Sequence, residues 1–178
     1  MGQRYRYFAI LAALGLTAVS IAVPQRAQVR KGFWIGLGLG YGSLGISCQS
    51  CNIGREGALS GYLKLGGTVS PKLLIGGETN GWTQGDEVAG NASLAAYYYP
   101  KVEGGLFLRG GLGLATYQRG SSDATGLGAV VGVGYDVRVG RNFSITPVAN
   151  FNWGYLGNQL GTGRSQNVMQ FVVGASFH

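Results

Sequence analysis

GFWIGLGLGYG, residues 32–42, alternates large apolar and small side chains with a period of two. Successive side chains of a β-strand point to opposite faces, so an alternation of this kind predicts a strand with two unlike faces. One face is apolar, and the other is glycine apart from Trp34. The apolar positions are Phe33, Ile35, Leu37, Leu39 and Tyr41.

Seven further segments of the chain repeat this alternation. With the first they give eight strands of about 10 to 12 residues, close to the ~9–11 residues that a tilted strand needs to cross a bilayer. Glycine makes up 34 of 178 residues and charged residues 12%, against about 7% and 25% in ordinary proteins. We predict an all-β, eight-stranded, antiparallel up-and-down transmembrane barrel. The further strands are expected around residues 59–69, 73–79, 92–98, 106–114, 127–137, 143–153 and 169–177.

The first 27 residues have the pattern of a secretory signal peptide. Arg4 and Arg6 precede an uncharged run over residues 8–23, and small residues follow it. The run is about 16 residues long, whereas a spanning helix needs about 20. We predict cleavage after Ala22 or Ala27 and assign residues 28–178 to the barrel.

Five ionisable residues inside the predicted strands indicate which face meets lipid. All five share the phase of the glycines, and none shares the phase of the large apolar residues. A soluble lipocalin-like barrel would carry many charges outside, whereas Arg or Lys facing lipid at mid-depth costs about 2–4 kcal/mol. We therefore predict an apolar outer face and a narrow lumen lined by glycines and charges. The five residues are Lys64, Glu78, Arg109, Asp136 and Arg138.

The segments between the predicted strands are of two kinds. Residues 70–72, 100–105 and 140–142 are rich in turn formers, and the alternate connections are longer polar stretches. Short turns at one end and longer loops at the other are typical of the periplasmic and extracellular ends of a bacterial barrel. An even number of strands places both termini at the short-turn end, so we expect both in the periplasm. The longer stretches are residues 47–56, 84–91, 118–124 and 156–165.

Taken together, these segments resemble the family of small outer-membrane β-barrels, the OmpA-like and OmpX-like eight-stranded proteins. The resemblance covers roughly residues 30–178 and includes LFLRGGLG (106–113) and VGVGY (131–135). The last strand is similar to the family's C-terminal insertion signal, with Phe171, Gly174 and Phe177 in its pattern; this chain departs from it in that His178 follows the final aromatic residue.

The resemblance implies a location in the outer membrane of a Gram-negative bacterium. It implies contact with membrane lipid and lipopolysaccharide, and with the barrel-assembly machinery during insertion. We expect a monomer. No Lys/Arg run with interleaved aromatic residues occurs, so nucleic-acid binding has no support.

The lumen charges have two interpretations. Glu78 and Arg109, with Lys64, Asp136 and Arg138 as neighbours, are expected to form an internal network, because an unpaired buried charge is costly. Such a network fills the lumen of an eight-stranded barrel, whose interior is normally packed. The alternative is a gate or an ion path.

Cys48 and Cys51 lie in the first long loop and suit an oxidising, exported location. A local disulfide is the first interpretation, and a reactive surface pair is the alternative. Redox chemistry of the thioredoxin type would need the motif at the start of a helix in a βαβ unit. Two cysteines and one distant histidine do not supply the four ligands of a zinc site, and no cofactor is expected.

The sequence predicts no catalytic residues. Acyl transfer needs a base beside a nucleophile, and the one histidine, His178, falls at the end opposite the long loops that carry Ser121, Ser122 and Ser165. A non-enzymatic barrel that supports the envelope or presents its loops to an extracellular ligand is the first functional hypothesis. A small pore or transporter for ions or small apolar solutes is the second, and a lipid-modifying enzyme is the third.

Overall fold

The computed structural model describes residues 30–48, 51–52, 54–157 and 163–178, and the predicted signal peptide lies outside these ranges. Within them the chain forms only strands and their connections, and none of it is a helix long and apolar enough to cross a membrane. The first five strands are β1 (Phe33–Cys48), β2 (Cys51–Asn52), β3 (Glu56–Ser70), β4 (Leu73–Gln84) and β5 (Glu87–Tyr98). The others are β6 (Leu106–Arg119), β7 (Ser122–Tyr135), β8 (Val137–Arg138), β9 (Phe143–Tyr155) and β10 (Arg164–Phe177).

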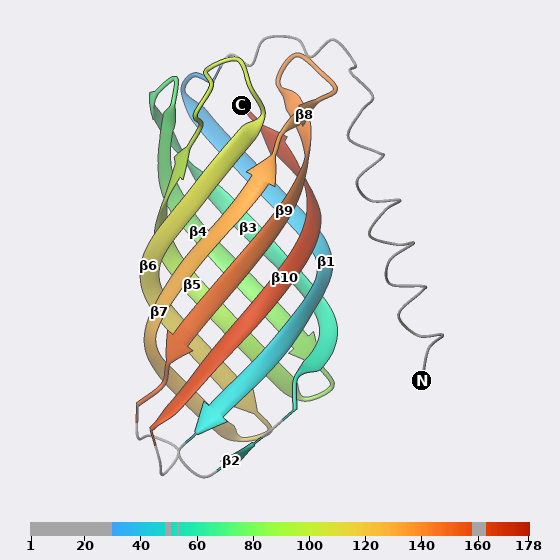
Figure 1. Cartoon of the computed structure of the whole chain (residues 1–178), viewed down its shortest axis with the longest axis vertical. Coiled ribbons are helices and arrows are strands. Elements are labelled where there is room, and N and C mark those ends of the chain that lie inside the picture. The colour runs from blue at the N-terminus through green and yellow to red at the C-terminus, as the bar shows by residue number, and fades with distance from the viewer. Residues whose placement is uncertain (1–29, 49–50, 53, 158–162) are drawn as a thin grey trace, which may run out of the picture.

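The eight long strands form one closed antiparallel barrel (Figure 1). Each long strand pairs with the next along the chain, and β10 closes the barrel by pairing with β1 from Ile35↔Phe177 to Cys48↔Arg164. The short strands β2 and β8 pair only with β1 and β9. The first residue of β1 and the last of β10 lie at the same end, which we call the terminal end; the opposite end is the loop end. The predicted fold is confirmed.

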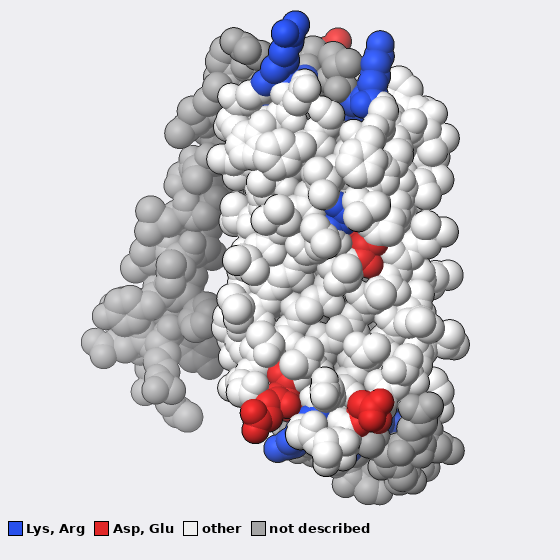
Figure 2. Space-filling view, turned by 180° about the vertical axis from the view of Figure 1, so that it is seen from behind, with Lys and Arg blue, Asp and Glu red and all other residues white. Residues whose placement is uncertain are grey.

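The predicted division of faces is also confirmed. Buried and exposed residues alternate along the long strands, and the large apolar residues of the sequence pattern are on the exposed face. On the face that Figure 2 shows, a broad uncharged band covers the barrel, with charged side chains gathered at its two ends and one small basic and acidic spot at mid-height. Leu112, near the middle of β6, is 74% exposed.

Inward-facing glycines make room for the large side chains of the lumen. A Cβ atom added to Gly38 would lie 2.8 Å from the Tyr62 ring and 2.8 Å from Val172. One added to Gly42 would lie 2.9 Å from Trp82. Such contacts are shorter than real Cβ atoms tolerate, so each glycine is the space that its bulky neighbour occupies.

The predicted contrast between short turns and long loops is wrong. The connections expected at residues 84–91 and 118–124 are two-residue turns, residues 85–86 and 120–121, and the glycine of each has φ +57°. Gln84 pairs with Glu87, and Arg119 with Ser122, so these polar residues extend the strands beyond the apolar belt instead of leaving them. At the terminal end, residues 99–105 and 136–142 connect their strands over longer paths than predicted.

Candidate functional site

The lumen is the region where polar and charged side chains gather. Arg109 and Glu78 form an ion pair in its middle, with Nη1 2.8 Å from Oε2 and side chains only 1% and 0% exposed. Asn80 completes the group, because its amide donates to Glu78 at 2.9 Å and its carbonyl oxygen accepts from Arg109 at 3.0 Å. Tyr97 also donates to Glu78. These four residues form what we call the charged layer.

Lys64 lies beside this layer among aromatic rings. It is the backbone partner of Glu78 across the β3 and β4 strands, yet its ammonium group faces the rings of Trp34, Tyr62, Tyr97 and Phe107. The distances to the four ring centroids run from 5.0 Å for Phe107 to 5.8 Å for Trp34. Such contacts attract a cation to the electron-rich faces of the rings.

Two apolar clusters close the lumen on either side of the charged layer. The terminal plug lies near the starts of β1, β4 and β6, and the loop plug lies near their ends. The terminal plug consists of Trp34, Tyr62, Leu74, Ala95, Tyr97, Tyr99, Phe107, Val148 and Val172. The loop plug consists of Leu44, Ile46, Trp82, Ala89, Ala115, Tyr117, Ala124, Leu156 and Val168. The ion pair of Glu78 and Arg109 therefore lies between two apolar clusters.

The remaining predicted lumen charges lie at the terminal end. Asp136, between β7 and β8, is fully buried and accepts hydrogen bonds from the Tyr99 hydroxyl at 2.8 Å and the Thr146 hydroxyl at 2.7 Å. Arg138 in β8 donates to the backbone carbonyls of Gly140, at 3.2 Å, and Arg141. The structure thus brings Lys64, Glu78 and Arg109 together and places Asp136 and Arg138 in a second group.

Arg30, ahead of β1, was missed by sequence reasoning. It is 3% exposed, its guanidinium lies 3.4 Å from the Tyr99 ring centroid, and it donates to the carbonyls of Val102 at 3.0 Å and Gly104 at 2.6 Å. Burial lowers the pKa of Arg30 and raises that of Tyr99 well above the usual range, where the Asp136 carboxylate adds to the effect. No pattern marks a single arginine outside the strands, so only the folded structure identifies it.

At the loop end the polar groups are more exposed. Tyr117 donates to the Glu87 carboxylate, and Arg119 lies 3.9 Å from the same group. Cys48 and Cys51 are backbone partners of β1 and β2. Their side chains lie outside the described residues, so the disulfide stays a prediction.

The residues of the predicted insertion signal occupy both faces of β10. Phe171 and Phe177 are exposed on the outer face. Gly174 faces the lumen, where a Cβ atom would overlap the Tyr62 hydroxyl. Within the described residues, no three His, Cys, Asp or Glu side chains gather as metal ligands would.

The geometry defines a class of architecture, a closed eight-stranded antiparallel barrel, and known structures share this fold. The Neisserial surface protein A matches with a TM-score of 0.55 and 17% identity over 84% of this chain and 99% of that one. Ail, the attachment invasion locus protein of Yersinia pestis, was solved with the heparin analogue sucrose octasulfate; it matches with a TM-score of 0.56 and 13% identity over 82% and 98%.

A third match is the N-terminal β-barrel domain of Pseudomonas aeruginosa OprF, with a TM-score of 0.50 and 16% identity over 84% of this chain and 100% of that domain. No protein-family model and no curated protein sequence matches the chain. At these identities the matches show that the fold is that of the small outer-membrane barrels.

Proposed function

We propose that the protein is a non-enzymatic integral protein of the outer membrane of a Gram-negative bacterium, with a closed lumen and a structural role in the envelope. The observation that carries this proposal is the pair of opposite surfaces on the same strands. An exposed apolar belt suits hydrocarbon, where a closed barrel leaves no backbone group unpaired. The lumen is filled by two apolar plugs and an ion pair.

The closed lumen favours the structural role over the pore. An ion would have to pass both plugs, in which Phe107 and Trp82 are almost wholly buried. The volume between the plugs is small as well, since the largest polar side chains there already contact one another. The predicted alternative of a pore therefore finds no support in the described residues.

The loop end favours a small exposed surface over a large adhesive one. Two of its four connections are two-residue turns. One of the matched proteins, Ail, is an attachment protein, but the described part of the loop end of this chain offers few side chains for such a role. Binding of an extracellular ligand by these connections remains the second form of the proposal.

The proposed orientation places the terminal end in the periplasm. An exported chain enters the outer membrane from the periplasm, so its N-terminus stays on that side. An even number of strands returns the C-terminus to the same side. In this orientation β10 presents Phe171 and Phe177 to lipid beside β1. The expected partners of the monomer are lipopolysaccharide and, during insertion, the barrel-assembly machinery.

Planar-bilayer conductance of the refolded protein tests the closed lumen. We expect no stepwise current from the wild type, because both plugs exclude ions. A double variant, Trp82→Ala with Phe107→Ala, removes the largest side chain of one plug and one ring of the other and should produce unitary steps. Reproducible steps from the wild type that disappear in Arg109→Ala would contradict the proposal and restore the pore.

Two simpler measurements test the location. A closed barrel resists detergent until it is boiled, so we expect heat-modifiable migration on a gel, and we expect the protein in the outer-membrane fraction. A folded protein that stays in solution without detergent would contradict the proposal.

A further inference from the structure

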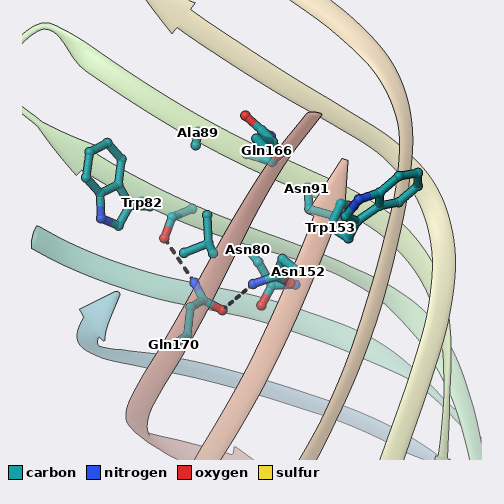
Figure 3. Close-up of a pocket in the computed structure, with 11 residues that line it drawn as sticks. Asn80, Trp82, Ala89, Asn91, Asn152, Trp153, Gln166 and Gln170 are labelled. Atoms are coloured by element: carbon teal, nitrogen blue, oxygen red, sulfur yellow. Dashed lines mark hydrogen bonds between the residues drawn. The ribbon is translucent and has the colours of Figure 1, made fainter. Parts of the chain in front are cut away.

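A small chamber lies in the lumen between the charged layer and the loop plug. Its volume is about 10 Å³, close to the least that holds one water molecule. Trp82, Ala89 and Val168 of the loop plug line it, and Asn80 connects it to the charged layer. Figure 3 shows that side-chain amides dominate its walls. The amide residues are Asn80, Asn91, Asn152, Gln166 and Gln170.

Three amide oxygens in this chamber have no hydrogen-bond partner among the described residues. They are Oδ1 of Asn91, Oδ1 of Asn152 and Oε1 of Gln166, and the three residues are between 4% and 5% exposed. A buried acceptor without a donor is costly, and native structures nearly always satisfy such groups. Three such oxygens on residues that line one chamber call for a donor inside it.

The orientation of these amides is fixed by backbone carbonyls. Gln166 Nε2 donates to the carbonyl oxygens of Thr116 at 3.0 Å and Gly90 at 3.4 Å, which fixes the way its amide is turned. Asn91 Nδ2 faces the carbonyl of Trp153 at 3.5 Å. Turning either amide over would set oxygen against oxygen.

Asn152 is oriented in the same way through Gln170. Gln170 Nε2 donates to the Gly81 carbonyl at 3.2 Å and to the Ser60 hydroxyl, which leaves its oxygen to accept from Asn152 at 2.8 Å (Figure 3). Asn152 Oδ1 is then directed away from that bond. All three free oxygens therefore require a donor that the described residues do not supply.

The chemistry of the walls selects a neutral partner. No carboxylate lines the chamber, and the nearest charge across Asn80 is the Arg109 guanidinium, so a cation would be desolvated without a counter-charge. Each amide nitrogen carries two hydrogens, so Asn91 and Asn152 keep a second N–H beside their free oxygens. A group that both donates and accepts matches these walls.

We propose that the chamber binds a single water molecule, whose two hydrogens are donated to the free amide oxygens of Asn91 on β5 and Asn152 on β9. The water connects Asn91 on one side of the lumen with Asn152 on the other. Trp82 and its neighbours in the loop plug separate it from the loop end, so it exchanges slowly with the surrounding water.

Cross-relaxation between water and side-chain amide protons, measured by NMR on the labelled protein in detergent micelles, tests the proposal. We expect cross-peaks between water and the NH₂ groups of Asn152 and Asn91, with the sign that is typical of a water molecule that stays bound. Their absence, with such peaks present elsewhere in the protein, would overturn the proposal. A fall in thermal stability when sodium is replaced by choline at equal ionic strength would also overturn it, because the occupant would then be a cation.

A matched pair of variants locates the water. Ala89→Val places two methyl groups in the chamber and should abolish the cross-peaks, while Ala124→Val adds the same volume to the loop plug away from the chamber walls and should keep them. Loss of the peaks in both variants would contradict the assignment to this chamber. If Ala89→Val does not fold, the wild-type spectra and the sodium replacement still decide the question.

A second inference concerns the charges of the two ends and rests on the proposed membrane location. Among the described residues, four exposed basic side chains and one exposed acidic side chain, Glu103, lie at the terminal end. At the loop end, three exposed acidic side chains stand against two basic ones, Arg55 and Arg119. The four basic residues are Lys31, Lys72, Lys101 and Arg141, and the three acidic residues are Glu56, Asp86 and Asp123.

The four basic residues surround the rim of the barrel. Each comes from a different segment: the chain before β1, the β3 to β4 turn, the β5 to β6 connection and the turn before β9. Exposed apolar residues, including Phe33 and Tyr98, lie next to them at the edge of the belt. Cations placed at this depth meet lipid headgroups, and each attracts anionic ones.

We infer that the terminal rim binds the phosphates of anionic phospholipids. Lipid retained by protein extracted in mild detergent from vesicles of phosphatidylcholine with phosphatidylglycerol tests this. The ratio of phosphatidylglycerol to phosphatidylcholine retained by the wild type should be about tenfold higher than the bulk ratio of the vesicles. The variant K31Q/K72Q/K101Q/R141Q should retain the bulk ratio, and the control R55Q/R119Q should behave as wild type.

The outcomes separate this inference from the proposed function. A wild-type protein that resists alkaline extraction from vesicles but retains lipid at the bulk ratio overturns the rim inference and leaves the membrane location standing. Equal loss of phosphatidylglycerol in the control variant also overturns it, because charge at either end would then suffice. A wild-type protein that alkali removes from the vesicles overturns both.

Discussion

The outer wall and the lumen are built from the same strands, yet they obey different rules. On the outer wall, large apolar residues stand side by side without filling one another's space, and glycines such as Gly77 have open surroundings. In the lumen, bulky side chains fill the space beside glycines such as Gly38 and Gly42, and Glu78 pairs with Arg109. Contact with the surrounding lipid decides which residues the outer wall carries, whereas close packing decides which residues the lumen carries. The two should therefore fail under different substitutions.

The largest effect is expected from breaking the buried ion pair. Glu78→Ala leaves the Arg109 guanidinium buried without its carboxylate, and such losses cost about 3–5 kcal/mol. The free energy of unfolding, from reversible urea titrations in lipid or detergent, measures it. The matched control is Arg119→Ala, which removes an ion pair at the loop end in which Arg119 is 72% exposed. The control should cost at most about 1 kcal/mol. Equal effects would show that the lumen is hydrated.

The next effect is expected from placing a charge on the wall. Leu112→Arg puts a cation at mid-depth in the belt and should destabilise the protein by about 2–4 kcal/mol in a bilayer. The control, Val139→Arg, adds the same charge at the terminal end, where it reaches water. It should cost about 0–1 kcal/mol. Unfolding titrations in the same vesicles compare the two, and a Leu112→Arg protein as stable as the control would remove the argument for a lipid-facing belt.

A smaller effect separates inner from outer glycines. Gly38→Ala forces a Cβ atom against Tyr62 and Val172 and should cost about 1–3 kcal/mol. Gly77→Ala, on the wall of β4, meets no atom within 4 Å and should be neutral or slightly stabilising. Both changes lose the same backbone freedom in the unfolded chain. The difference between their free energies of unfolding therefore reports the packing of the lumen alone.

The sequence predicts the wall better than the lumen. The wall follows from one local rule, the period of two, so the exposure of Leu112 and Phe171 could be predicted without any partner strand. The pairing of Glu78 with Arg109 depends on the registers of β4 against β5 and of β5 against β6, which place Ser93 opposite Glu78 and Arg109 opposite Tyr97. Register is set by turn geometry, and the turns were where the prediction was wrong.

The same limit explains the amide chamber and the Arg30 contacts. Asn91, Asn152 and Gln166 share only the inward phase in the sequence, and β5, which carries Asn91, is far along the chain from β9 and β10. The sequence predicts loops at the two-residue turns of residues 85–86 and 120–121 because polar residues continue the strands beyond the belt. The change from apolar to polar residues along a strand shows where the lipid ends. In this chain the strands stay hydrogen-bonded to one another beyond that point.

The smallest effect is expected where the lumen meets water at the terminal end. His178 follows the last strand, and burial lowers its pKa to about 4, with Arg30, Lys64 and Arg138 adding to the effect and Asp136 opposing it. The folded protein therefore resists protonation that the unfolded chain accepts below about pH 6.5. Stability should fall as the pH drops from about 6.5 to 4 and change little above that window. Because the imidazole is only partly buried and solvent screens it, the loss should be about 1 kcal/mol, less than the full pKa difference would give.

Unfolding titrations at pH 7 and pH 4.5, with His178→Gln as the control, isolate this contribution. The variant should lose part of the acid sensitivity and should match wild type at pH 7, because the neutral imidazole and the amide carry no charge there. Carboxylates contribute their own acid sensitivity to both proteins and cancel in the difference. An identical pH dependence in the two proteins would mean that the imidazole is open to water, and that the filled lumen ends before residue 178.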